Sequence, residues 1–168
     1  MIVLENKVEI DKALYPVLKK VSDPEIPAVS IIDMGMVREA KLEDGTAKVK
    51  VTPTYSGCPA TDMIMFDVKM ALEQAGFISE VEQVIDPPWT TDWITEEGRK
   101  NMEEFGIAPP KEATADRRAL DGESHIVKCT NCGSKHTKMV SQFGSTACKA
   151  RFVCKDCGEP FDYFKCLI

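Results

Sequence analysis

Two short cysteine motifs constrain this chain more than any other feature of its sequence. They read Cys-Thr-Asn-Cys-Gly at 129–133 and Cys-Lys-Asp-Cys-Gly at 154–158. Two cysteines in this spacing, followed by a glycine, turn tightly enough to direct both sulfurs at one ion, and two such pairs complete a tetrahedral thiolate site. We therefore predict a metal site made of four side chains: Cys129, Cys132, Cys154 and Cys157.

The segment that contains these motifs, 125–168, is expected to fold as a small β-rich zinc ribbon. Its residues 139–143 and 151–153 read as short strands. A segment of about 45 residues buries little core, so the ion would supply much of its folding free energy. Four thiolates leave Zn²⁺ no open coordination position, which makes the predicted role structural.

The sequence leaves the metal and two further cysteines open. The spacing does not distinguish zinc from rubredoxin-like iron or from an iron–sulfur cluster, and we favour zinc. Cys148 and Cys166 do not belong to either motif. They are either packing thiols or additional ligands of an iron site.

A seventh cysteine, Cys58, lies in a different setting, between a Ser56-Gly57 turn and Pro59. Proline is favoured at the first position of a helix, so we expect a helix over 59–75 with Cys58 at or next to its N-cap. The free N–H groups and the positive dipole end there would stabilise a thiolate, which makes Cys58 a nucleophile or a soft-metal ligand. The alternative is a small, half-buried core cysteine.

The rest of the first 106 residues predicts an α+β domain, a small mixed sheet with helices on one side. A helix is expected to start near Tyr15 and to stop by the acidic loop at 23–27. Strands are expected over 36–42, 47–51 and 77–85, the first two joined by an Asp-Gly hairpin turn. We expect Trp89 and Trp93 to pack on the core, with a partner-binding surface as the alternative. Thr95 is expected to cap a helix that ends at Gly106.

Composition sets the domain boundary and excludes some classes of partner. Residues 107–124 are charged and poor in large apolar side chains, so they read as a linker between domains 1–106 and 125–168. Residues 1–123 carry 14 basic against 24 acidic side chains, a charge of −10, and residues 124–168 carry 7 against 3, a charge of +4. This balance, −6 in total, does not give the basic face of a nucleic-acid-binding protein.

The sequence also predicts a cytoplasmic protein. It has no apolar run near the roughly 20 residues of a membrane span. Its first residues lack the basic and apolar regions of a secretory signal. In the cytoplasm cysteines stay reduced, so the cysteine pairs are expected to bind metal and not to form disulfides.

Four segments together resemble a known family. Asp-Pro-Glu-Ile-Pro at 23–27, the stretch at 29–38 and Thr-Pro-Thr-Tyr-Ser-Gly-Cys-Pro-Ala-Thr-Asp-Met-Ile at 52–64 are similar to the SufT/PaaD-type iron–sulfur-assembly domain. The tail at 143–166 resembles the branch called PaaD or PaaJ, from bacterial phenylacetate degradation. The likeness covers nearly the whole chain and both modules in order.

The resemblance implies an accessory factor for the multicomponent oxygenase that epoxidises phenylacetyl-CoA. Such a factor would help to mature an iron–sulfur centre, with the reductase component and its plant-type [2Fe–2S] cluster as the expected client. By motif, Cys58 corresponds to the family's reactive cysteine, Asp33 to its Asp-x-Gly-x-Val segment and Thr61 to its Cys-Pro-Ala-Thr segment. Met34 and Met36 depart from the common Leu and Ile-like residues, which affects packing and not the site.

We therefore expect an assembly factor in which Cys58 handles iron or a transient cluster. Asp33, Thr61 and the acidic loop residues Asp23 and Glu25 would lie nearby. One thiolate per chain cannot hold a stable cluster, so a homodimer, an iron–sulfur scaffold or the oxygenase and reductase components must supply further ligands.

Other classes of function remain as alternatives. An enzyme with Cys58 as nucleophile would normally need a histidine base, and the two histidines, His125 and His136, both lie in the tail outside any recognisable catalytic motif. We therefore do not expect an enzyme. A regulatory zinc-ribbon protein that contacts nucleic acid or polymerase conflicts with the acidic charge. An electron carrier is a further alternative, and a colourless purified protein would exclude it.

Overall fold

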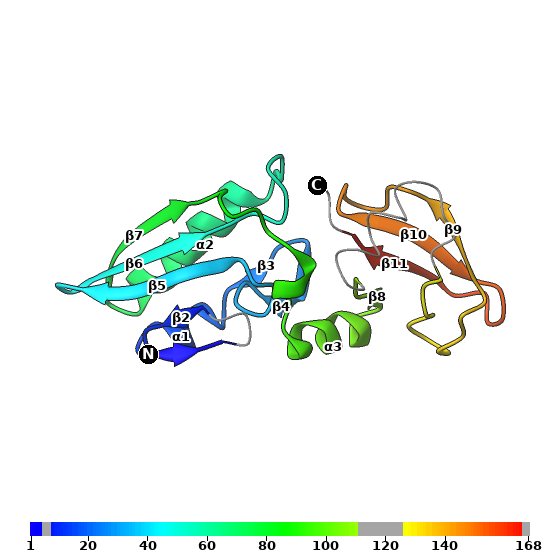
Figure 1. Ribbon diagram of the computed structural model, residues 1–168, viewed down its shortest axis with the longest axis horizontal. Coiled ribbons are helices and arrows are strands. Elements are labelled where there is room, and N and C mark those ends of the chain that lie inside the picture. Colours follow the sequence, from blue (N-terminus) through cyan, green and yellow to red (C-terminus); the bar gives the residue numbers. More distant parts are fainter. Residues whose placement is uncertain (5–7, 111–125, 166–168) are drawn as a thin grey trace. The chain divides into compact units, whose positions relative to one another are not determined.

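The structure, a computed structural model, describes residues 1–4, 8–110 and 126–165. It divides into two compact units, Met1–Gly98 and Arg99–Ile168 (Figure 1). Each unit has its own sheet.

The first unit is built on a five-stranded mixed sheet with the order β1-β2-β5-β6-β7 (Figure 1). Strands β5 and β6 form the predicted antiparallel hairpin, whose turn residues Asp44 and Gly45 both have a positive φ, 50° and 81°. Strand β7 runs parallel to β6, and β2 runs parallel to β5. The strands are β1 (Ile2–Val3), β2 (Glu9–Ile10), β5 (Val37–Glu43), β6 (Thr46–Val51) and β7 (Ile78–Gln83).

Helix α2 (Thr61–Gln74) makes the crossover between the parallel strands β6 and β7. It buries Ile64, Val68 and Leu72 at helical spacing and is followed by Gly76, whose φ of +88° stops the helix. The short helix α1 (Tyr15–Leu18) packs against α2 and starts at the predicted residue. Its Pro16 lies in the first turn, where a missing N–H costs nothing.

The remaining elements before the second sheet carry the loops discussed below, and the last of them, α3 (Glu96–Glu104), begins in the first unit and ends in the second. Strands β3 (Ser22–Asp23) and β4 (Ile26–Ser30) form a small two-stranded sheet around the acidic loop. A 3-10 turn, η1 (Thr91–Trp93), is followed by α3. The predicted cap of α3 is present, because the Thr95 hydroxyl accepts the N–H of Gly98 at 3.0 Å.

The second unit contains a four-stranded sheet with the order β8-β11-β10-β9 (Figure 1). Its core holds Phe152, which stacks on Phe161 at 5.9 Å and meets Tyr163 edge-on at 5.8 Å between ring centroids. The strands are β8 (Ile107–Ala108), β9 (Thr137–Ser141), β10 (Lys149–Cys154) and β11 (Pro160–Phe164). The expectation of an α+β domain followed by a β-rich ribbon is confirmed.

Strand β8 lies inside the range predicted as a linker. Ile107 and Ala108 pair in parallel with Asp162 and Tyr163 of β11, so these two residues belong to the ribbon sheet. Residues 111–124 of the predicted linker lie outside the described residues. In the part of the chain that the structure describes, none of the helices has the length and apolarity needed to cross a membrane.

Candidate functional site

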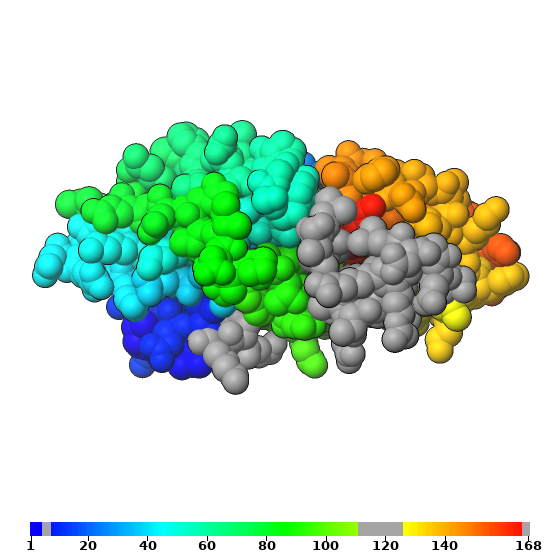
Figure 2. Space-filling view, turned by 45° about the horizontal axis from the view of Figure 1, so that its top comes forward, coloured from blue at the N-terminus to red at the C-terminus, as the bar shows by residue number. Residues whose placement is uncertain are grey.

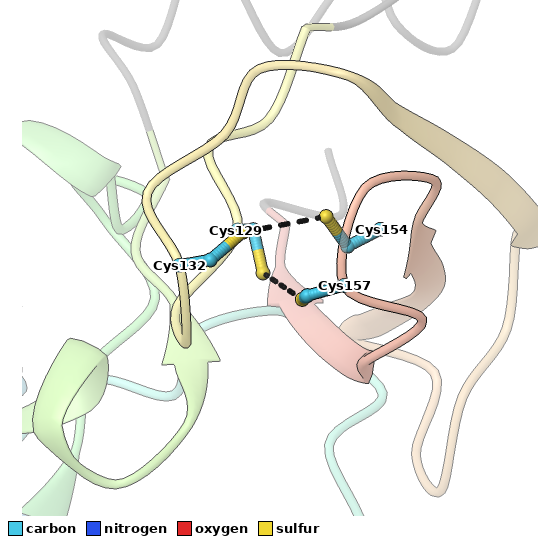
Figure 3. A group of neighbouring side chains, drawn as sticks. All are labelled: Cys129, Cys132, Cys154 and Cys157. Atoms are coloured by element: carbon cyan, nitrogen blue, oxygen red, sulfur yellow. Dashed lines mark hydrogen bonds between the residues drawn. The ribbon is translucent and has the colours of Figure 1, made fainter.

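The structure gathers the four cysteines of the two motifs into one cluster (Figure 3). Their sulfurs all lie within 4.8 Å of one another, and two close sulfur pairs join one motif to the other, Cys129 to Cys157 at 3.8 Å and Cys132 to Cys154 at 3.6 Å. Four sulfurs at about 2.3 Å from a tetrahedral zinc ion are about 3.8 Å apart. The donor set and its spacing therefore fit a zinc ion.

Both cysteine motifs fold into the same turn. In the first, the N–H of Gly133 bonds to the carbonyl of Cys129 at 3.0 Å, and in the second the N–H of Gly158 bonds to the carbonyl of Cys154 at 3.0 Å. Gly133 and Gly158 have φ values of +74° and +79°, which only glycine adopts without strain. We call these two turns the first knuckle (129–133) and the second knuckle (154–158).

The cysteines of the cluster differ in their tendency to ionise. Backbone N–H groups, first that of Cys157 and also that of Asp156, lower the pKa of Cys154 to about 7 against the effect of desolvation. The backbone N–H of Ser134 acts in the same sense on Cys132, but the neighbouring sulfurs outweigh it and raise the pKa of Cys132 to about 12. The cluster therefore resists full ionisation unless a cation compensates the charge.

Cys148 and Cys166 are the two cysteines that belong to neither knuckle and are not Cys58. The buried Cys148 is not a member of the four-sulfur cluster, and its sulfur lies 3.1 Å from the hydroxyl of Thr146. Cys166, the other candidate for an additional ligand, lies outside the described residues.

Cys58 lies in a surface turn between β6 and α2, half-buried, with Gly57 and Pro59 exposed beside it. The loop of residues 52–60, coloured between cyan and green, reaches the surface of the first unit (Figure 2). The predicted helix start was wrong by two residues, because α2 begins at Thr61 with Ala60 as its N-cap. The carbonyl of Cys58 accepts both the N–H of Thr61 at 3.3 Å and its hydroxyl at 2.8 Å, which closes a separate turn before the helix.

Asp33 is almost fully enclosed, with 4% of its side chain exposed, and several donors converge on its carboxylate. The ammonium of Lys19 contacts both oxygens, at 2.6 and 2.7 Å. The hydroxyls of Ser30 and Thr95 donate at 2.5 and 3.1 Å. Asp33 therefore joins the end of α1, the end of β4 and the cap of α3.

The pairing of β5 with β6 brings the segments that carry Asp33 and Cys58 to the same end of these two strands. Val37 at the start of β5 pairs with Val51 at the end of β6, and the N–H of Thr52 bonds to the carbonyl of Met36 at 2.8 Å. The two loops that flank this pairing are the ones that carry Asp33 and Cys58. Strand β4 leads into the first of them from the acidic loop.

In the acidic loop, the side chain of Asp23 accepts the N–H groups of Glu25 and Ile26 at 2.7 and 3.2 Å and so holds the turn between β3 and β4.

Among the described residues, the four-cysteine cluster is the one group of three or more potential metal ligands that lie close together. Cys58, Asp23, Glu25 and Asp33 are therefore not gathered into a second such group.

The expectation that both tryptophans pack on the core is met by Trp89, which is buried and donates its indole N–H to the carbonyl of Met34 at 2.9 Å. Trp93 is half-buried, and the guanidinium of Arg38 lies 3.5 Å from its ring centroid. Sequence reasoning missed this pair and the role of Lys19, because no local pattern connects these residues.

Comparison with known proteins agrees with both modules. A family model described as an iron-sulfur cluster assembly protein matches residues 11–87, and one described as the PaaD zinc beta ribbon domain matches residues 113–165. The chain is thus of the class that joins an iron–sulfur assembly domain to a zinc ribbon.

One relative aligns over nearly the whole chain. It is a putative 1,2-phenylacetyl-CoA epoxidase subunit from Escherichia coli, and it is 42% identical over 158 residues, which are 92% of each chain. The chain therefore belongs to the PaaD family, and the resemblance seen in its sequence is confirmed.

Two further matches cover the first unit. The Fe-S protein maturation auxiliary factor of Porphyromonas gingivalis is 32% identical over 92 residues, which are 53% of this chain and 87% of that protein. The crystal structure of a domain of unknown function from Bacillus anthracis has a TM-score of 0.50 and 30% identity, and it covers 53% of this chain and 87% of that one.

Proposed function

We propose that this protein is an accessory factor that helps to assemble an iron–sulfur centre of the multicomponent phenylacetyl-CoA epoxidase. The observation that carries the proposal is the alignment over both modules with an epoxidase subunit, together with a first module of the iron–sulfur assembly family. The expected client is the reductase component with its [2Fe–2S] cluster. The protein acts in the cytoplasm and catalyses no reaction of its own.

Cys58 is the residue that we assign to iron or to a transient cluster. Its turn is exposed on both sides of the cysteine, and a thiolate is the ligand that iron–sulfur chemistry uses. One thiolate leaves most of the iron coordination to other groups, so the client, a scaffold protein or a second copy of this chain supplies the rest. The iron is cargo in this scheme and not a resident cofactor.

The other residues of the proposed site hold the turn of Cys58 and the loops that precede β5. The Thr61 hydroxyl fixes the carbonyl of Cys58, Asp33 ties its loop to Lys19 and Thr95, and Asp23 shapes the turn that presents Glu25. These contacts support a positioning role for Thr61, Asp33 and Asp23.

The ribbon holds one structural zinc ion through Cys129, Cys132, Cys154 and Cys157. Zinc with four thiolates supplies a closed cross-link and no reactive position. The ribbon then serves as a folded surface for protein partners.

The test of the assembly role is Cys58→Ala, with Ser56→Ala as the matched control in the same exposed turn. In cells, Cys58→Ala should lower epoxidase activity and the iron content of the purified reductase, while Ser56→Ala leaves both unchanged. The purified Cys58→Ala protein should keep the wild-type circular dichroism spectrum and melting temperature. A variant that unfolds would show that Cys58 is a core residue, and full maturation of the reductase would refute the assignment.

No observation favours a cysteine-nucleophile enzyme. His136 lies in the ribbon and pairs with Asp156, and His125 is outside the described residues.

A further inference from the structure

The two knuckles exchange side-chain contacts outside the four sulfurs. Asn131, between the cysteines of the first knuckle, directs its amide N–H to the sulfur of Cys157 at 3.8 Å. Asp156, between the cysteines of the second knuckle, accepts the hydroxyl of Ser134, and its other oxygen lies 2.8 Å from Nδ1 of His136. Asn131 thus reaches the second knuckle, and Asp156 reaches the residues that directly follow the first knuckle.

The backbone holds the groups that meet Asp156. The hydroxyl of Ser134 accepts the N–H of His136 at 2.9 Å, which fixes both side chains on one short turn. The carbonyl of His136 accepts the N–H of Lys155 at 2.8 Å, so the main chain of the second knuckle is joined to the same turn. Ser134, His136 and Asp156 thus link the two knuckles through side chains and backbone at one place.

These contacts add little to global stability, because His136 and Asp156 are 62% and 53% exposed. Their effect is local. Each knuckle supplies two of the four sulfurs, and the ion leaves when one pair of sulfurs moves away from the other. Contacts that keep the knuckles together return a detached pair to the ion before the second pair dissociates. Groups hydrogen-bonded to metal ligands typically change metal affinity about 10–100-fold. The side chains of Ser134, His136 and Asp156 contact one another and not the sulfurs, so their effect should lie at the low end of this range.

We propose that Ser134, His136 and Asp156 form a clasp that holds the two knuckles around the metal and slows its release. Asn131 adds to this by donating to the sulfur of Cys157 in the closed ribbon. These are positioning residues, and none of them is a ligand. The inference rests on the metal binding proposed for the ribbon.

The experiment uses the full chain loaded with one equivalent of Zn²⁺ and mixed with an excess of a chromophoric chelator. His136→Ala should transfer zinc about ten times faster than the wild type, because the exposed clasp is expected to act at the low end of the range for such groups. His136→Asn keeps an N–H donor near the position of Nδ1 and should restore a near-wild-type rate. Lys135→Ala removes an exposed side chain between Ser134 and His136 and serves as the control, with a rate within twofold of the wild type.

A second readout tests whether the variants still have four sulfur ligands. The Co²⁺-loaded His136→Ala protein should keep the thiolate-to-metal absorption bands of a four-sulfur site. Loss of these bands would mean that the variant no longer has the four-sulfur site. It would refute the claim that the clasp slows metal release without changing the ligands. Zinc transfer from His136→Ala at the wild-type rate would overturn the clasp alone. A wild-type chain that retains no zinc would overturn the proposed metal site and the clasp with it.

Discussion

Replacement of Asp33 by asparagine tests whether this carboxylate holds the first unit together. The substitution keeps the size of the side chain and removes its charge. The ammonium of Lys19, now 2.6 and 2.7 Å from the two carboxylate oxygens, would lose the partner that its burial requires. The Ser30 and Thr95 hydroxyls would compete for one remaining acceptor oxygen.

The expected loss follows from the geometry of this pair. Removal of one partner of a buried ion pair costs about 3–5 kcal/mol, because the other charge stays desolvated. Lys19 retains 26% side-chain exposure and a second contact, with Glu97 at 3.0 Å, so part of its charge can be solvated or paired again. We therefore expect Asp33→Asn to lower the free energy of unfolding by about 2–3 kcal/mol.

The assay is urea unfolding followed by tryptophan fluorescence, which reports on the first unit because both tryptophans, Trp89 and Trp93, lie in it. A double-mutant cycle with Lys19→Met should give a coupling free energy of about 1–2 kcal/mol. The control is Glu39→Gln, since Glu39 pairs with Lys41 on the exposed face of the sheet and should cost less than about 1 kcal/mol. An Asp33→Asn protein that is as stable as the wild type, yet inactive in maturation, would refute the positioning role. It would favour a direct role of Asp33 in binding iron.

Three further predictions concern the backbone, the titration of Lys19 and the ribbon. Gly35→Ala should destabilise the first unit by about 3 kcal/mol or more, because a Cβ there would lie 2.5 Å from the Cβ of Trp93 at a φ of +72°. Gly45→Ala has open space around it, so it should lower the free energy of unfolding by only about 1–2 kcal/mol in the same urea assay. Burial acts to lower the pKa of Lys19, but its hydrogen bonds to two carboxylates outweigh this and raise it above 10.5. The stability difference between the wild type and Lys19→Met should therefore be constant from neutral pH up to 10.5 and shrink as the pH rises through the folded-state value, as measured by urea unfolding at each pH. Cys154→Ser, or a strong chelator, should release the metal and unfold the second unit while tryptophan fluorescence of the first unit is unchanged; elemental analysis and NMR spectra check this.

The features that the sequence predicted well depend on residues close together along the chain. The two knuckles, the Asp44-Gly45 turn and the Thr95 cap each follow from the side-chain and backbone preferences of a few neighbouring residues. The four-sulfur cluster was predictable for the same reason, since each knuckle forms locally and one ion can join two of them.

The features that escaped prediction depend on pairing between distant segments or on competition for one backbone group. Strand β8 comes from a stretch with linker composition and becomes a strand because Ile107 and Ala108 pair with β11. Helix α2 starts two residues later than predicted, after a separate turn in which the carbonyl of Cys58 accepts the N–H and the hydroxyl of Thr61. Lys19 carries no motif at all, and its role appears only when Asp33 is seen beside it.

The polar residues of the family motifs are engaged within the fold itself. Asp33 receives an ammonium and two hydroxyls, Thr61 donates to the carbonyl of Cys58, and Asp23 accepts two backbone N–H groups. Because these contacts hold the loop before β5, the turn before α2 and the turn between β3 and β4, they favour a positioning role for these residues over a role as iron ligands. In the proposed assembly role, the single Cys58 would accept iron only where another protein supplies the remaining ligands. The proposed factor would then act on a client and would not store a cluster of its own.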